Sequence, residues 1–286
     1  MVSLSLLERR ALALVHGLAA GESLGLQDHG RSEANEATRS ALGLARAAAR
    51  LGRIDEASLR RVALEGELNL SVWRVEEFED SLAGAASALA VGIARRPQDY
   101  NGIVDDVVSI IAIHRYTSQA VAGGCAVAAA VAALLDGWDL EGAVALAATI
   151  AKRGSTFGRK AGPVTLPGEI WEVWARVDEH TIGRAANLER ALEAIEGFPP
   201  LPRALGIAYA CRDAGLAVKA AAALPDHQRI TGAIAGSLCA AFRPDSLPGE
   251  WAEAAAVSTR ALGFDPERIA LDLLALRLKK WSLILG

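Results

Sequence analysis

The sequence predicts an all-α protein, a compact bundle of many helices. Apolar residues recur at helical spacing along almost the whole chain. The short runs of valine and isoleucine lack the alternation of apolar and polar residues, flanked by turns, that marks β-strands. With 286 residues, of which 52% are hydrophobic, the chain is long enough to bury a large core.

Turn residues separate the predicted helices. Glycine and proline interrupt the helical pattern at Gly52, at Pro97 and again at Gly137. Two helix starts have capping chemistry: Asp55 opens one helix, and Pro266 stands at the first helical position of another. We expect helices at residues 5–20, 36–51, 56–68, 77–95, 101–113, 117–135, 139–152, 170–177, 181–195, 201–214, 215–224, 229–242, 248–262 and 266–280.

No stretch rich in serine, glycine or proline divides the chain, so we expect a single domain over residues 1–286. There is no internal repeat at the spacing of a solenoid. The longest irregular stretch, residues 154–168, is rich in glycine. A loop of that length in a compact domain is usually functional or mobile.

Composition excludes several classes of protein. The net charge is −4 and the basic residues are scattered, which argues against a nucleic-acid partner. The start of the chain lacks the apolar region of a signal peptide. Residues 120–135 are apolar and uncharged but fall short of the roughly 20 residues that span a bilayer, so we expect a buried helix and no membrane partner.

The three cysteines, Cys125, Cys211 and Cys239, all lie in apolar, alanine-rich surroundings without a Cys-x-x-Cys spacing. They are expected to be reduced, buried thiols and not a disulfide framework or a zinc site. Together with the missing signal peptide, this favours a cytoplasmic location.

Residues 226–242 are the stretch around which we expect the bundle to be organised. The stretch starts with polar residues and continues as a helix of very small side chains, among them Gly232 and Gly236. Small side chains let neighbouring backbones approach closely, so this helix is expected to run through the middle of the bundle. Asp226 stands at its start, where a carboxylate suits a helix cap and the helix dipole. It is either a cap or part of a site.

The same stretch resembles a known family. Ile230-Thr-Gly-Ala-Ile-Ala-Gly236 and the turn before it are similar to the C-terminal signature of the ADP-ribosylglycohydrolases, in which the helix opens with Gly-Asp-x-Asp-Thr. In this chain Asp226 matches the first aspartate of that opening. Gln228 replaces the second aspartate, and Arg229 replaces the threonine.

Further blocks resemble the same family in the same order, over residues 12–251. Residues 14–25 look like its opening helix and Gly-Asp-Ala-Leu-Gly turn, with Glu22 in place of the aspartate, in the loop after the first helix. Residues 35–45 are similar to its Thr-Asp-Asp-Thr helix, and residues 247–251 to its Ile-Pro-x-x-Trp. Residues 110–122 resemble its Thr-His turn and keep the histidine as His114. Residues 83–92 lack the family's Gly-Asn-Gly and arginine.

In the Thr-Asp-Asp-Thr block, this chain has Asn35, Glu36, Ala37 and Thr38 in the four positions. Ala37 thus removes one carboxylate outright. Only Glu36 remains of the two acidic residues at this place.

The resemblance implies an all-helical hydrolase that removes ADP-ribose with two magnesium ions held by carboxylates. Magnesium requires hard oxygen ligands in near-octahedral geometry, and two metal ions can orient a sugar and activate a water. Of the four acidic positions this chain keeps Glu36 and Asp226, so we expect a single weakly held magnesium ion or none. An arginine such as Arg229 can replace a lost metal electrostatically.

Glu36 and Asp226 are also the candidate catalytic residues, as general acid and base of a glycosidase without metal. The structural alternative is a first-turn acid for Glu36 and a cap for Asp226. The resemblance and the loop positions add seven candidate ligand-binding residues: Glu22, Asn35, His114, Arg159, His227, Gln228 and Arg229. For His114 the alternative is a buried, hydrogen-bonded histidine, and for Arg159 a solvated loop residue.

Three functions stay open at this point. The first is a hydrolase of an ADP-ribose-like or nucleoside-type ligand, with a reduced or metal-independent site. The second is a non-catalytic relative that binds a nucleotide-like ligand or a partner. The expected binding partner is a small nucleotide-like molecule or an ADP-ribosylated acceptor. The third is an interaction protein that reuses the bundle.

Overall fold

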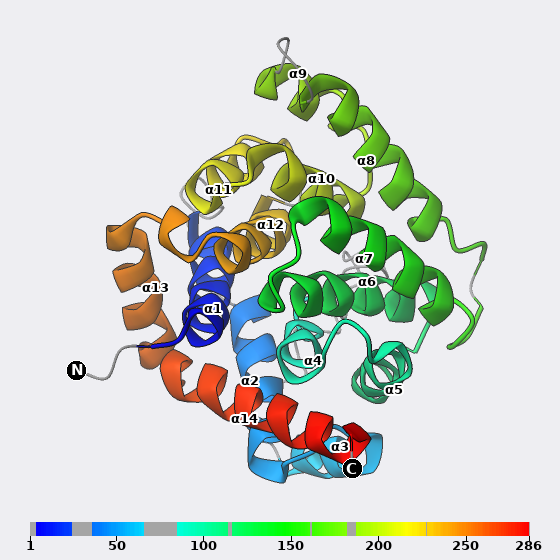
Figure 1. The fold of residues 1–286 in the computed structure, drawn as a ribbon, viewed down its shortest axis with the longest axis vertical. Coiled ribbons are helices and arrows are strands. Elements are labelled where there is room, and N and C mark those ends of the chain that lie inside the picture. The colour runs from blue at the N-terminus through cyan, green and yellow to red at the C-terminus, as the bar shows by residue number, and fades with distance from the viewer. Residues whose placement is uncertain are drawn as a thin grey trace.

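Two helices that each carry a pair of glycines, α1 (Leu6–Leu24) and α12 (Gln228–Phe242), cross at the centre of the fold (Figure 1). The computed structural model describes residues 4–24, 36–65, 85–113, 116–160, 162–181, 187–226 and 228–285. These residues form α-helices and one 3₁₀ turn, with no β-strand among them, so the predicted all-α class is confirmed. The remaining elements are α2 (Glu36–Leu51), α3 (Glu56–Leu64), α4 (Leu89–Ala94), α5 (Tyr100–Ile111), α6 (Ser118–Leu135), α7 (Leu140–Gly154), α8 (Leu166–Thr181), α9 (Leu188–Glu193), α10 (Pro200–Cys211), α11 (Ala214–Ala222), η2 (Pro244–Ser246), α13 (Gly249–Ala261) and α14 (Pro266–Leu285).

The crossing of α1 and α12 is made by two pairs of glycines that face each other. Gly17 and Gly21 on α1 meet Gly236 and Gly232 on α12. A Cβ atom built on Gly17 would lie 2.6 Å from the carbonyl oxygen of Gly236, and one on Gly21 would lie closer still to Gly232. On each helix the two glycines are four residues apart and therefore share one face. The two backbones touch directly, which confirms the predicted central place of residues 226–242.

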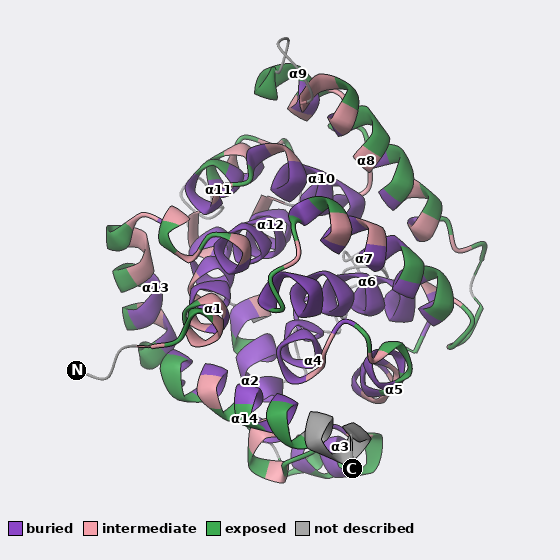
Figure 2. Ribbon diagram, viewed as in Figure 1, coloured by how far each residue is buried: buried purple, intermediate pink, exposed green. Residues whose placement is uncertain are grey.

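The other helices pack around this pair (Figures 1 and 2). α10 and α11 pack on α12, whereas α13 and α14 pack on α1. The second buried helix is α6, which packs against α4, α7 and α12. It is long and apolar enough to cross a membrane by length and composition, yet 94% of it is buried inside the fold. The predicted buried helix over residues 120–135 is therefore confirmed.

A buried arginine joins α14 to the ends of α4 and α6. Arg277 donates hydrogen bonds to the carbonyl oxygens of Gly92 (3.1 Å) and Ala132 (3.3 Å), and it pairs with the carboxylate of Asp136. Only 2% of Arg277 is exposed. Burial lowers its pKa, against the opposing effect of Asp136. A cation is favoured at helix C-termini, where the dipole is negative, and Arg277 supplies donors to carbonyl groups at two such ends.

The helix boundaries differ from the predicted ones in two places that matter below. α1 continues through Gly21 to Leu24, so Glu22 lies on the helix and not in a following loop as predicted. Gly21 lies inside the helix, and its missing side chain lets α12 approach. α8 begins at Leu166, which shortens the predicted irregular stretch. The predicted helix at residues 77–95 is described only from residue 85, and there α4 covers Leu89–Ala94.

Candidate functional site

The site is built around Glu22, which follows Gly21 directly on α1. The close crossing of α1 and α12 brings its side chain to the start of two other helices. Its Oε1 accepts a hydrogen bond from the backbone N–H of Ala37 (2.9 Å), and its Oε2 accepts one from Thr38 (2.8 Å). Only 2% of Glu22 is exposed. The carboxylate thus caps α2 from another helix, where the helix dipole favours a negative charge.

Arg229, in the first turn of α12, completes the environment of this carboxylate. Its Nη2 lies 3.1 Å from Oε1 of Glu22, and about a third of its side chain, 32%, is exposed. A positive charge is unfavourable at a helix N-terminus, because the dipole is positive there. The ion pair with Glu22 offsets this repulsion. α1, α2 and α12 are therefore joined by one buried negative and one half-buried positive charge.

Two hydroxyl groups in the same helix starts have no hydrogen-bond partner among the residues that the structure describes. Thr38 lies in the first turn of α2 and Thr231 in the first turn of α12, and both are fully buried. Buried polar atoms are nearly always paired in proteins, so unpaired ones often mark a place where a water or a ligand group is bound.

Asp226 lies two residues before α12, and its carboxylate is engaged by α10. Oδ1 of Asp226 accepts a hydrogen bond from Nη2 of Arg203 at 2.5 Å. Arg203 is almost fully buried and donates a second bond to the carbonyl oxygen of Glu196 at 2.9 Å. Asp226 itself is more than half exposed, at 55% of its side chain. This pair fixes the start of α12 against α10.

Sequence reasoning missed Arg203. It is the lone charged residue of a helix that is otherwise apolar, Pro200–Cys211. A single charged residue in an otherwise apolar helix is expected to be buried with its neighbours, and a buried charge needs a partner. That signal indicates a partner without identifying which residue it is.

Gln228 and Arg159 have other contacts. The side-chain amide of Gln228 donates to the carbonyl oxygen of Leu224, so it ties the start of α12 back to the end of α11. Arg159 is exposed on the loop after α7, and its backbone N–H donates to the carbonyl oxygen of Tyr116 at 2.9 Å. The backbone N–H of Ser118 in turn donates to the carbonyl oxygen of Arg159 at 3.1 Å. These two bonds hold the loop against the start of α6. The described contacts of Arg159 therefore belong to α6 and not to the Glu22–Arg229 pair.

Four predicted site residues are not placed. Asn35, His114 and His227 lie outside the described residues. Glu36 begins α2, but its side chain is outside the described part of the chain. The pairing of Glu36 with Asp226 as acid and base therefore stays a prediction.

The described residues do not fit a pair of magnesium ions. They contain no group of three or more histidine, cysteine, aspartate or glutamate side chains that could hold a metal ion. Both carboxylate oxygens of Glu22 are already bonded to backbone N–H groups, and Asp226 is paired with Arg203. Magnesium needs several hard oxygen ligands in octahedral arrangement, and these two acids are engaged elsewhere.

No protein-family model and no curated protein sequence matches the chain. Among solved structures, a chain described as an ADP-ribosylglycohydrolase-related protein complex is similar to it. The two share 19% sequence identity with a TM-score of 0.58, over 96% of this chain and 100% of the other. At this level of identity the likeness concerns the fold. This protein has the all-α fold of an ADP-ribosylglycohydrolase-related protein.

Proposed function

We propose that this protein binds an ADP-ribose-like or nucleoside-type ligand at the joined starts of α2 and α12, without a two-magnesium hydrolytic mechanism. The observation that carries the proposal is the Glu22 carboxylate, bonded to two backbone N–H groups of α2 and to Arg229. In this arrangement a guanidinium supplies a fixed positive charge beside a buried carboxylate, which is the electrostatic task of a bound cation.

The charges at this place suit an anionic ligand. A guanidinium presents its N–H groups in a fork that matches the geometry of phosphate oxygens. The start of a helix attracts phosphate because its first N–H groups point outward and the dipole is positive there. Glu22 takes the N–H groups of Ala37 and Thr38 on α2. The start of α12, which carries Arg229, is the one we assign to the ligand's phosphate groups.

Two buried hydroxyl groups at the same place are available for hydrogen bonds. Thr38 and Thr231 supply hydrogen-bonding capacity in the two helix starts, because neither hydroxyl has a partner in the described part of the chain. Because both residues are fully buried, waters that bridge them to a ligand are suitable partners. Asp226 is exposed enough to contact such a ligand, although its first task is to hold α10 and α12 together.

The test is calorimetric titration of ADP-ribose into the purified protein, once with magnesium and once with a chelator. We expect the same affinity in both. Arg229→Ala should weaken binding about tenfold or more, since a charge-assisted hydrogen bond contributes about 1.5–3 kcal/mol. Arg39→Ala is the matched control, because Arg39 is exposed on the first turn of α2 and loses the same charge. Thermal unfolding of each variant checks that it is folded.

Two results would overturn the proposal. Binding that needs magnesium would mean that side chains beyond Glu22 and Asp226 assemble a metal site. The absence of binding heat under both conditions would mean that the fold serves a different ligand. Incubation with an ADP-ribosylated peptide, followed by mass spectrometry, separates binding from hydrolysis: we expect no release of ADP-ribose above the buffer rate.

A further inference from the structure

Four exposed cations lie within nine residues of one another where α7 ends, at the outer edge of the fold (Figures 1 and 2). Lys152 and Arg153 are in the last turn of α7, and Arg159 and Lys160 are in the loop that follows. The sequence has no aspartate or glutamate at positions 142–168, so most of α7 and the whole loop bring no negative charge to this place. The net charge of −4 for the whole chain conceals this local excess of positive charge.

The four cations are not neutralised by the described residues around them. None of them forms an ion pair with a described residue, and Arg153 donates to the neutral side-chain amide of Asn101 on α5. On α5, Asp99 and Asp106 are both paired with Arg95 instead. The dipole of α7 favours cations in its last turn, but it does not account for the two cations in the loop, which follow the end of the helix.

Exposed aromatic rings border the same cations. The exposed aromatic residues of the described chain are Tyr100, Tyr116, Phe157 and Trp171. Phe157 is 39% exposed and stands in the chain between the two pairs of cations. Tyr116 is 42% exposed, and its carbonyl oxygen accepts the backbone N–H of Arg159 at 2.9 Å. Tyr100 directly precedes Asn101, the partner of Arg153. Three of the four exposed aromatic residues are therefore next to the cations.

The first part of the loop after α7 is fixed against α6, so these side chains are held in place. Gly158 has a φ of +81°, in the left-handed region that favours glycine. A Cβ atom on Gly158 would lie 2.7 Å from the carbonyl carbon of Thr117, so the two backbones are in direct contact. A surface whose backbone is already fixed loses less conformational entropy when a ligand binds.

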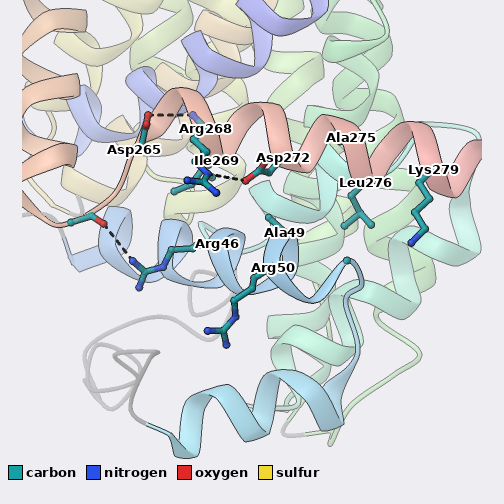
Figure 3. Close-up of a pocket in the computed structure, with 12 residues that line it drawn as sticks. Arg46, Ala49, Arg50, Asp265, Arg268, Ile269, Asp272, Ala275, Leu276 and Lys279 are labelled. Carbon is teal, nitrogen blue, oxygen red and sulfur yellow. Dashed lines mark hydrogen bonds and ion pairs between the residues drawn. The ribbon is translucent and has the colours of Figure 1, made fainter.

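The groove between α2 and α14 lacks both properties (Figure 3). Two of its apolar lining residues, Ile269 and Leu276, are only 4% and 5% exposed. Of its cations, Arg46, Arg50 and Lys279 each interact with another group of the protein. The end of α7 is therefore the more accessible positively charged surface.

We propose that the basic–aromatic face, formed by Lys152, Arg153, Arg159, Lys160, Tyr116 and Phe157, binds single-stranded nucleic acid. The cations attract phosphates, and the rings provide surfaces on which unpaired bases stack. In a nucleic-acid strand each base is attached between two phosphates, and Phe157 likewise stands between two pairs of cations. Four cations suit a short contact with three or four phosphates. Sequence preference is not expected, because every base has a face that can stack.

Three other anionic partners fit this face less well. A duplex keeps its bases inside the stack, so Tyr116 and Phe157 would have no base to contact. An anionic membrane takes up rings that project from the protein, whereas more than half of each of these two residues is covered here. An acidic peptide can meet the cations but offers no base to the rings. Composition argued against a nucleic-acid partner because it averages over the whole chain and does not reveal a local patch of charge.

The probe is a fluorescein-labelled strand of twelve thymidines, and its fluorescence anisotropy is measured with the full-length protein. We expect saturable binding at 50 mM salt that weakens about tenfold or more at 200 mM, because three or four neutralised phosphates release their counterions. Arg159→Ala should weaken binding about threefold or more and make the salt dependence shallower by about one counterion. Phe157→Leu should weaken binding about fivefold or more without changing the salt dependence, because it removes a ring and not a charge.

Arg39→Ala is the control for the loss of charge, since Arg39 is exposed on α2 and its loss should leave binding unchanged. Thermal unfolding of each variant checks that it is folded. The proposal is overturned if the strand does not bind, if Arg39→Ala weakens binding as much as Arg159→Ala, or if a duplex of the same length binds as tightly. Tighter binding to vesicles of anionic lipid or to polyglutamate than to the strand would also overturn it, and would assign the face to a membrane or to an acidic protein.

Discussion

Arg229 lies 3.1 Å from Glu22, 207 residues away in the chain, and the pair joins the starts of α2 and α12 to the end of α1. The carboxylate also accepts the N–H groups of Ala37 and Thr38, so it is fully engaged while only 2% of the residue is exposed. A buried carboxylate without its partners is unfavourable by several kcal/mol. The pair is therefore expected to stabilise the fold as well as to shape the candidate site.

We predict a strong energetic coupling between these two residues. Glu22→Ala should lower the free energy of unfolding by about 3–5 kcal/mol, because it leaves the start of α2 without its cap and Arg229 without its partner. Glu22→Gln and Arg229→Met, alone and combined, form a double-mutant cycle. We expect a coupling of about 1–3 kcal/mol from urea unfolding curves.

The exposed pair of Arg60 and Glu56 on α3 is the control for this cycle. Both side chains are about half exposed and lie one turn apart, at 2.7 Å. Their coupling should be about 0.5 kcal/mol or less. An equally small coupling for Glu22 and Arg229 would show that the buried pair does not hold the three helices together.

The glycine contact between α1 and α12 should not tolerate a methyl group. In Gly17→Ala the new Cβ would lie 2.6 Å from the carbonyl oxygen of Gly236 and 2.9 Å from the Cα of Ser237. Backbone atoms cannot move aside as a side chain can, so the helices must separate. We expect a loss of about 3 kcal/mol or more, or failure to fold, measured by thermal and urea unfolding.

Gly168→Ala is the matched substitution, since Gly168 is also helical and a Cβ there would meet no atom within 4 Å outside its chain neighbours and its own helix backbone. It should leave the stability unchanged or raise it by about 0.5–1 kcal/mol, because alanine restricts the unfolded chain. Unchanged stability for Gly17→Ala would show that the two helices are less closely packed than the structure describes.

The helical class and the centre of the bundle follow from local patterns. Apolar spacing near 3.6 residues indicates helices, and small residues at positions 232 and 236 indicate a close crossing. The role of Glu22 could not be obtained in this way, because Gly21 before it has the character of a helix breaker. Its partner Arg229 is set by how α1 and α12 cross, which no local pattern encodes. The contact of Asp226 with Arg203 is of the same kind.

Arg277 should be the most sensitive charged residue of α14. Arg277→Met removes the donors to Gly92 and Ala132 and leaves the Asp136 carboxylate without its cation. We expect a loss of about 3–5 kcal/mol in urea unfolding. Arg277→Lys should also be destabilising, because one ammonium group cannot serve two helix ends at once.

Arg268→Met on the same helix provides the comparison. The side chain of Arg268 is 80% exposed and its ion pair with Asp272 spans 3.7 Å. This variant should stay within about 0.5 kcal/mol of the wild type. If Arg277→Lys changed the stability as little as Arg268→Met, the hydrogen bonds of Arg277 to the ends of α4 and α6 would not be needed for stability, against this prediction.

The buried thiols should make the protein less stable in alkaline solution. Burial raises the pKa of Cys211 to about 12, with a smaller contribution from Asp213, and raises the pKa values of Cys125 and Cys239 further. In the unfolded chain these thiols ionise near pH 8.5. Above pH 8.5 the folded state therefore holds more protons than the unfolded state, so the free energy of unfolding falls as the pH rises. Below pH 8.5 the stabilisation by the buried, neutral thiols is fully present.

Each thiol should contribute a slope of up to about 1.4 kcal/mol per pH unit between roughly pH 9 and the raised pKa. Urea unfolding at pH 7.5, 9 and 10, with a reducing agent present, measures this slope. Cys211→Ala should reduce it by the contribution of one thiol, and comparison with the wild type removes the background from tyrosines and lysines. A thiol reagent should not react with the folded protein at pH 8 but should label all three cysteines in urea. If Cys211→Ala and the wild type lost stability at the same rate above pH 9, Cys211 would have to ionise in the folded protein, in conflict with its burial in the core.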